Sequence, residues 1–185
     1  MKKWLIPVIV IGVIVYSIYN WAVGFNNTAV EYQEDAKTAW SNVESSYQRR
    51  NDLIGNLVKT VQGAADFEKE TLTAVINARA KATSVNINAG DLTPEKMAQF
   101  QQAQAGMSGA LSKLLVSVER YPELKANANF LELQSQLEGT ENRINVARDR
   151  FNEGVNTYNK LIKKFPGSCL ASMFNCDEMD RCKSN

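Results

Sequence analysis

The sequence predicts an all-α protein in which one N-terminal transmembrane helix leads into an antiparallel, up-and-down four-helix bundle. Residues 4–25 contain no charged side chain. As a helix they would span about 33 Å, enough to cross a hydrocarbon core of about 30 Å. Beyond them, apolar residues recur at steps of three and four, which indicates amphipathic helices. Short connections between sequential helices favour antiparallel neighbours.

The two ends of the apolar segment look like the boundaries of a membrane span. Lys2, Lys3 and Trp4 stand at its start, and aromatic residues gather at its other end: Tyr16, Tyr19, Trp21 and Phe25. A cleavable signal peptide would share the charged start and the apolar middle. This segment, however, runs into bulky residues rather than a small-residue cleavage site. We therefore expect residues 1–25 to remain as an uncleaved anchor in contact with membrane lipid.

The distribution of charge indicates the orientation of the anchor. Two lysines precede the span, whereas the first basic residue after it is Lys37, which follows three acidic residues. The positive-inside rule then places the short N-terminus in the cytoplasm. We expect a single-pass protein of the bacterial inner (cytoplasmic) membrane whose domain faces the periplasm.

The domain, residues 26–166, begins with a helix over residues 27–62 that carries a narrow apolar seam. The seam residues recur at alternating steps of four and three, with one gap at Arg50: Ala36, Trp40, Val43, Tyr47, Ile54, Leu57 and Val61. Gly63 interrupts this pattern, and Asp66 is placed to cap a second helix that runs to about Thr83. The apolar positions of the second helix are Phe67, Leu72, Val75 and Ile76.

Thr93 and Pro94 form the start signal of a third helix, which runs to about Tyr121, where Pro122 ends it. A last segment, residues 128–164, keeps steps of three and four over about five heptads. Its core positions are Phe130, Leu133, Leu137, Thr140, Ile144, Ala147, Phe151, Gly154, Tyr158, Leu161 and Phe165. Alone it would form a homotypic coiled coil, but three further amphipathic helices favour an intramolecular bundle. Four alternating helices would return its end to the membrane beside Phe25, followed by a tail over residues 167–185.

The composition argues against an enzyme. The chain has no histidine, which removes histidine-dependent hydrolase triads, HExxH zinc sites and Glu-x-x-His di-iron bundles. Neither G-x-x-x-x-G-K-[ST] nor G-x-G-x-x-G occurs, so both phosphate-cradling loops are missing. The 21 basic and 20 acidic residues are scattered, so we expect no nucleic-acid partner. We also expect no catalytic residue, no cofactor and no metal.

Several long and idiosyncratic stretches carry a family resemblance: RRNDLI (49–54), ERYPELKAN (119–127), GTENRI (139–144) and FPG (165–167). With the rest of residues 39–82 and 111–162, they closely resemble the LemA family. The resemblance implies a bitopic membrane protein with a four-helix bundle and no defining catalytic site. The tail departs from the family pattern, because cysteines and acidic residues stand where aliphatic and aromatic residues usually continue.

Arg50 lies on the apolar seam of the first helix, three residues after Tyr47 and four before Ile54. A buried guanidinium without a partner is costly, so we expect a carboxylate to meet it. Glu141 on the last helix is the favoured partner, in a structural ion pair, and Glu138 is the second choice. The alternatives are an exposed, solvated side chain and a site for an anionic ligand such as lipid phosphate.

The tail contains three cysteines at a C-x₆-C-x₅-C spacing: Cys169, Cys176 and Cys182. This is not a usual zinc spacing, and no histidine completes it. Two of the cysteines would form a disulfide in an oxidising compartment, or all three serve as small apolar residues.

Two further groups have both a structural and a functional reading. The acidic clusters Glu31/Glu34/Asp35 and Asp66/Glu68/Glu70 lie near helix starts, which favours solvated or capping carboxylates over acid–base chemistry. In the tail, three apolar residues share one face at helical spacing, either to dip into the membrane interface or to pack across the end of the bundle: Leu170, Met173 and Phe174.

These observations predict a membrane-anchored, non-enzymatic scaffold or adaptor of the bacterial cell envelope, binding other envelope proteins or copies of itself. The alternatives are a regulatory partner of a membrane protease or other membrane enzyme, and a lipid-binding or membrane-shaping module. The span lacks G-x-x-x-G, so we expect self-association as a homo-oligomer to use a seam on the third helix formed by Gly106, Met107 and Gly109. Parallel anchors would favour a ring or curved cap.

Overall fold

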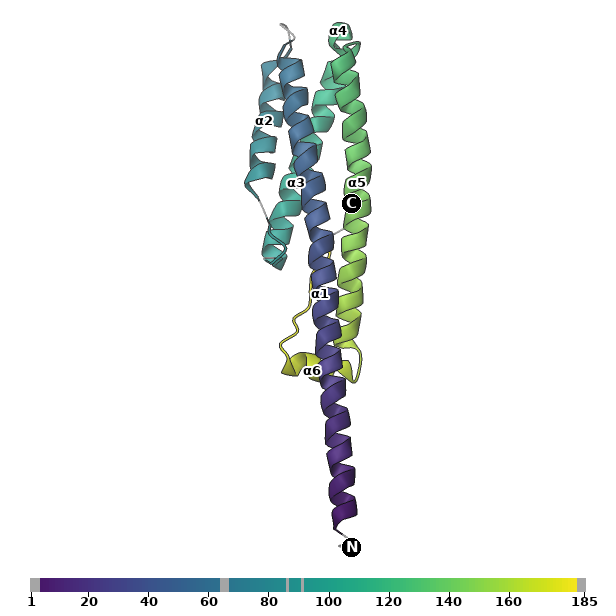
Figure 1. Cartoon of the computed structure of the whole chain (residues 1–185). Helices are drawn as coiled ribbons and strands as arrows, with labels where there is room; N and C mark the ends of the chain where they lie inside the picture. Colours follow the sequence, from purple (N-terminus) through teal and green to yellow (C-terminus); the bar gives the residue numbers. More distant parts are fainter. Residues whose placement is uncertain (1–3, 64–66, 86, 91, 183–185) are drawn as a thin grey trace. The chain divides into compact units, whose positions relative to one another are not determined.

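A computed structural model describes residues 4–63, 67–85, 87–90 and 92–182. All regular structure in these ranges is helical (Figure 1). The helices are α1 (Leu5–Gln62), α2 (Lys69–Ser84), α3 (Pro94–Val118), α4 (Pro122–Lys125), α5 (Ala128–Lys163) and α6 (Gly167–Met173). The chain forms two compact units, an anchor unit (residues 1–36 and 153–179) and a core unit (residues 37–152 and 180–185). Helices α1 and α5 contribute residues to both.

The starts of α3 and α5 are fixed by side-chain caps. Thr93 accepts a hydrogen bond from the backbone N–H of Lys96, and Pro94 occupies the first turn of α3, as the sequence predicts. The Asn127 side chain accepts the N–H groups of Asn129 and Phe130 at the start of α5. The predicted cap Asp66 lies outside the described residues. Helix α2 begins after Glu68, whose side chain makes no cap hydrogen bond.

In the core unit, buried apolar side chains from α1, α2, α3, α4 and α5 form one hydrophobic cluster. The predicted seam of α1 is buried in full, including its one charged member, Arg50. Trp40 is completely buried, contacts the rings of Phe100 and Phe151 edge-on, and donates its indole N–H to the Ile87 carbonyl at 2.8 Å. A buried tryptophan usually needs such a partner, so the loop after α2 is tied to α1 through this bond.

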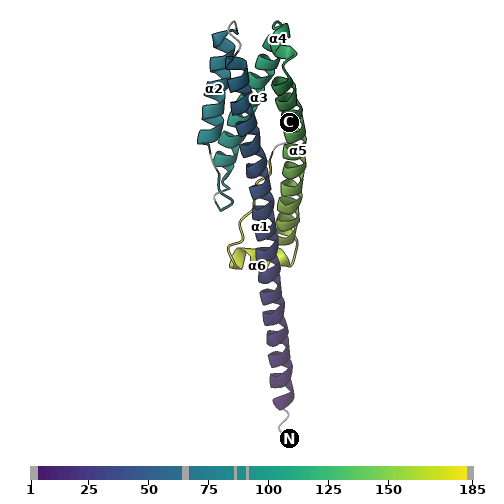
Figure 2. The ribbon, with the colours of Figure 1, turned by 45° about the horizontal axis from the view of Figure 1, so that its top comes forward.

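In the anchor unit, α1 packs against the end of α5 and against α6. A Cβ on Gly154 would lie 3.3 Å from Cα of Ala36, and a Cβ on Gly167 would lie 2.6 Å from Cε2 of Phe25. The two glycines therefore mark close approaches to α1. Between them a small core forms from Phe25, Ala29, Tyr158, Ile162, Leu170 and Ala171. Figure 2 shows α6 lying across α1 at this place.

Two of the predicted core positions are wrong. Phe165 is 83% exposed, whereas Ile162, which was not among the predicted core positions, is buried. The reason is that α5 ends at Lys163, so helical spacing no longer decides where residue 165 lies. Ile76 on α2 is 40% exposed, whereas its neighbour Val75 is fully buried. The short α2 turns a narrower face to the core than the sequence pattern indicates.

Candidate functional site

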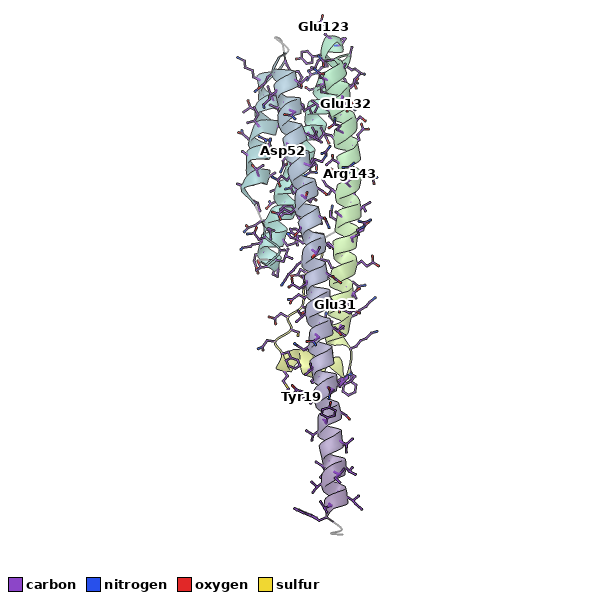
Figure 3. The ribbon with its side chains drawn as sticks, in the orientation of Figure 1. Tyr19, Glu31, Asp52, Glu123, Glu132 and Arg143 are labelled. Carbon is purple, nitrogen blue, oxygen red and sulfur yellow. The ribbon has the colours of Figure 1, made fainter. Side chains whose placement is uncertain are left out.

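The first part of α1 is an apolar helix without protein cover. Residues 4–21 are all exposed. An 18-residue window of α1 reaches a mean hydropathy of 2.0, long and apolar enough to cross a membrane. Its polar side chains bond back to the helix, with Ser17 Oγ donating to the Val13 carbonyl and Asn20 to the Tyr16 carbonyl, each at 2.8 Å. Figure 3 shows Tyr19 projecting from this stretch. Such internal satisfaction of polar groups is what a lipid environment demands.

The apolar tail residues do not share one environment. Leu170 is buried against the anchor-unit core, whereas Met173 is 70% exposed and Phe174 is 38% exposed. The sequence placed all three on one face. Leu170 therefore packs in the core, whereas Met173 and Phe174 remain exposed, as does Phe165 before α6. We call Phe165, Met173 and Phe174 the apolar collar.

Two asparagines of α5 hold the tail by its backbone. In the anchor unit, the Asn159 amide accepts the N–H of Met179 at 3.0 Å and donates to its carbonyl at 2.7 Å. In the core unit, Asn152 does the same with Cys182, at 2.8 and 3.0 Å. Our sequence reasoning missed both residues. The available signal is a Phe-Asn pair and a Tyr-Asn pair seven residues apart, which puts two polar side chains beside core positions.

The structure brings Arg50 and Glu141 together. Arg50 is 3% exposed, and its Nη1 donates to Glu141 Oε2 and to Ser108 Oγ, both at 3.1 Å. Nη2 donates to Gln104 Oε1 at 2.6 Å, and the guanidinium carbon lies 4.8 Å from the centre of the Tyr47 ring. The cluster joins α1, α3 and α5, but Nε has no hydrogen-bond partner among the described residues. The stabilising role of the ion pair is a prediction, tested below.

The same geometry bears on the anionic-ligand alternative for Arg50. A cavity of about 210 Å³ opens beside the guanidinium, and Glu141 lines it too. A carboxylate already stands where a bound anion would have to sit. Because like charges repel, the cluster is better suited to structure than to phosphate binding.

The three cysteines are free thiols in three different settings. Cys169 is exposed, Cys176 is partly buried, and Cys182 is buried with its Sγ 3.8 Å from Sδ of Met97. Burial raises the pKa of Cys182 from 9.0 to about 11, although nearby Arg148 acts in the opposite direction. Burial and the charge of Asp177 also raise the pKa of Cys176. Disulfide formation stays a prediction.

The described members of the acidic clusters lie in different settings. Glu68 accepts hydrogen bonds from Ser117 and Arg120, which ties the start of α2 to the end of α3. Glu31 and Asp35 are exposed, and Asp66 lies outside the described residues. Within the described ranges, no group of three or more histidine, cysteine, aspartate or glutamate side chains is placed to hold a metal ion.

These features define a membrane protein in which one candidate N-terminal span continues into a helical domain. The chain belongs to the LemA family, whose model matches residues 39–185. Neither the family name nor the names of the relatives given next denote an enzyme.

Three relatives illustrate the relationship. The chain is 29% identical over 164 residues to Magnetosome protein MamQ of Magnetospirillum gryphiswaldense, covering 78% of this chain and 60% of that protein. It is 28% identical over 162 residues, with the same coverage, to Magnetosome protein MamQ 2 of Paramagnetospirillum magneticum. Protein LemA of Metamycoplasma hominis is 23% identical over 182 residues, covering 94% of this chain and 78% of that protein. The chain thus spans about 60% of the length of the MamQ relatives.

Proposed function

We propose that this chain is a membrane-anchored, non-enzymatic scaffold or adaptor of the bacterial cell envelope. The observation that carries the proposal is one helix, α1, whose first part is exposed and uncharged while its last part lines a packed core. Such a helix ties a folded domain to a bilayer. The exposed helical faces then bind other envelope proteins or further copies of the chain. Because the MamQ relatives are longer, the partner is inferred from this chain's own surfaces.

The proposal includes an antiparallel four-helix bundle formed by α1, α2, α3 and α5. Its support is the shared core of the core unit and, in the anchor unit, the close approach of Ala36 on α1 to Gly154 on α5. It also places the chain in the inner membrane with the domain in the periplasm. That orientation rests on Lys2 and Lys3, which lie outside the described residues.

Crosslinking and affinity capture from native membranes test the scaffold role. The full-length chain is crosslinked in intact cells, solubilised in detergent and purified, and the captured proteins are quantified. Val116 on α3 is 71% exposed, so a Val116→Lys variant changes one outer face without touching the core and should reduce capture if that face binds the partner. A scaffold should capture non-catalytic envelope proteins or tagged copies of itself.

Two other outcomes would replace the proposal. Reproducible capture of one membrane protease or other enzyme at equal stoichiometry would support a regulatory subunit. Capture of lipid alone, with no protein above the background of unrelated single-pass proteins, would support a lipid-binding or membrane-shaping module. Either result contradicts the scaffold.

A further inference from the structure

We propose that the apolar collar, Phe165, Met173 and Phe174, inserts into the boundary between lipid headgroups and acyl chains, giving the domain a second contact with the bilayer beside the span. The inference rests on the proposed membrane anchoring. It assigns a lipid-binding role to a segment that lies outside the span in sequence, after α5 has ended.

The position of the collar follows from packing inside the anchor unit. Gly167, the first residue of α6, lies against Phe25, so close that a Cβ would meet the ring at 2.6 Å. Phe25 is four residues after Trp21, or about 6 Å along a helix. Trp21 and Tyr19 are exposed at the end of the uncharged stretch, where aromatic side chains mark a membrane–water boundary. Helix α6 is therefore fixed at the level where the span leaves the membrane.

Helix α6 and the residues that flank it divide into a buried set and an exposed set. Leu170 and Ala171 are buried against the anchor-unit core, which holds the segment in place. The collar residues are exposed to different degrees, 83% for Phe165 before α6, 70% for Met173 at its end and 38% for Phe174 just after it. Large apolar side chains left exposed to water are unfavourable, and lipid at the level of α6 would be continuous with the lipid around the span.

Charged residues stand where an interfacial helix needs them. Lys160 and Lys163 are exposed on the last turn of α5, and Lys164 is exposed just after it, directly before the collar. Lys163 pairs with Glu178 of the tail. Lysine stems lie along apolar surface while their ammonium groups reach the headgroups, so this arrangement accommodates a shallow insertion and resists a deep one. The occupant that fits is a lipid bilayer rather than a protein groove.

Photocrosslinking tests this inference directly. The photoreactive residue p-benzoylphenylalanine replaces Phe165 or Met173, one at a time, in the full-length chain, which is reconstituted into vesicles of tritiated phosphatidylcholine. Two reference positions receive the same residue. Ile9, in the middle of the uncharged stretch and 62% exposed, reports the anchor. Glu153, exposed on α5 in the anchor unit and about 15 Å before the end of that helix, reports background.

Labelling at 165 and 173 should exceed that at 153 by about fivefold or more and approach that at position 9. Labelling at position 9 alone, with 165 and 173 at the level of 153, overturns the collar and leaves the anchor standing. Absence of labelling at position 9 overturns the anchor, and with it the proposed function. Equal labelling at all four positions shows non-specific lipid contact and also overturns the collar.

Discussion

Arg50 places a positive charge inside the core unit, and the groups that face it determine what each replacement costs. Arg50→Met leaves Gln104 Oε1, on a residue that is 4% exposed, without its donor. An unsatisfied buried acceptor of this kind costs about 1–3 kcal/mol. Glu141→Leu instead leaves the buried cation with neutral partners only. Breaking a fully buried pair costs about 3–5 kcal/mol. The Glu141 side chain is 48% exposed, so we expect a loss at the lower end of that range.

We therefore expect Glu141→Leu to lower the free energy of unfolding by more than Arg50→Met, measured by urea unfolding in detergent. The double variant Arg50→Met/Gln104→Leu should recover much of the loss of Arg50→Met, because both buried polar partners are removed together. Small and equal losses in the two single variants would show that the ion pair does not stabilise the fold.

Because of Cys182, the free energy of unfolding should depend on pH in the alkaline range. Its thiol has a pKa of about 11 in the folded chain against 9.0 for an ordinary thiol. Below pH 9 both states are protonated, so this contribution is fully present. Between pH 9 and pH 11 the unfolded chain releases the proton first, and the free energy of unfolding falls by up to about 3 kcal/mol. Denaturant unfolding at several pH values measures the slope.

A Cys182→Ala variant is the control for this titration. It should show a shallower fall over the same pH range, because the other groups with raised pKa values, Tyr47, Tyr158 and Cys176, remain. An unchanged slope would mean that the Cys182 thiol is open to water in solution.

At the scale of elements, Gly167 determines whether α6 can dock. A methyl group there would lie 2.6 Å from the Phe25 ring and 3.0 Å from the Leu161 carbonyl oxygen. Gly167→Ala should therefore loosen α6 and raise the rate of maleimide labelling at Cys176 several-fold, as read by mass spectrometry of the tail. Gly106→Ala is the matched control, since nothing lies within 4 Å of its Cβ. It should leave that rate unchanged and stabilise α3 by up to about 1 kcal/mol.

The sequence predicts helix starts and buried positions best where neighbouring residues alone determine them. Thr93 and Pro94 start α3 through a cap and a fixed φ, and the gap at Arg50 in the α1 seam identifies a buried cation. The pattern fails where a helix has ended, as at Phe165. The pattern also fails to predict contacts with a segment that has no regular structure. The extended tail bound by Asn152 and Asn159 is such a segment. Only the folded chain reveals that pairing.

The predicted self-association seam on α3 needs a correction. Gly106 and Gly109 face outward with open space beside them, but Met107 is fully buried in the core and is not available to a second copy. Met107 directly follows Gly106 in the sequence. Successive residues of an α-helix are rotated by about 100°, so the two residues lie on different faces of α3. If α3 meets another chain, the two glycines form the contact without the methionine.

For the whole molecule, we predict that full-length chains assemble laterally in the membrane. Anchors that all point the same way favour a closed ring or a curved cap over a back-to-back pair. Light scattering of the detergent-solubilised protein should give a mass that is a multiple of one chain. Leucine at both Gly106 and Gly109 should reduce it. The mass of a single chain at every concentration would contradict lateral assembly.

The asparagine contacts with the tail have a consequence for how freely its sequence can change. Asn152 and Asn159 form their hydrogen bonds to the tail with main-chain N–H and carbonyl groups of Cys182 and Met179, which every residue except proline presents in the same form. Substitution at Met179 therefore keeps the tether as long as the backbone N–H remains. The tail thus has two points of attachment that do not depend on side-chain identity, so it can change sequence at its exposed positions, such as Asp177 and Asp180, without losing its place on α5.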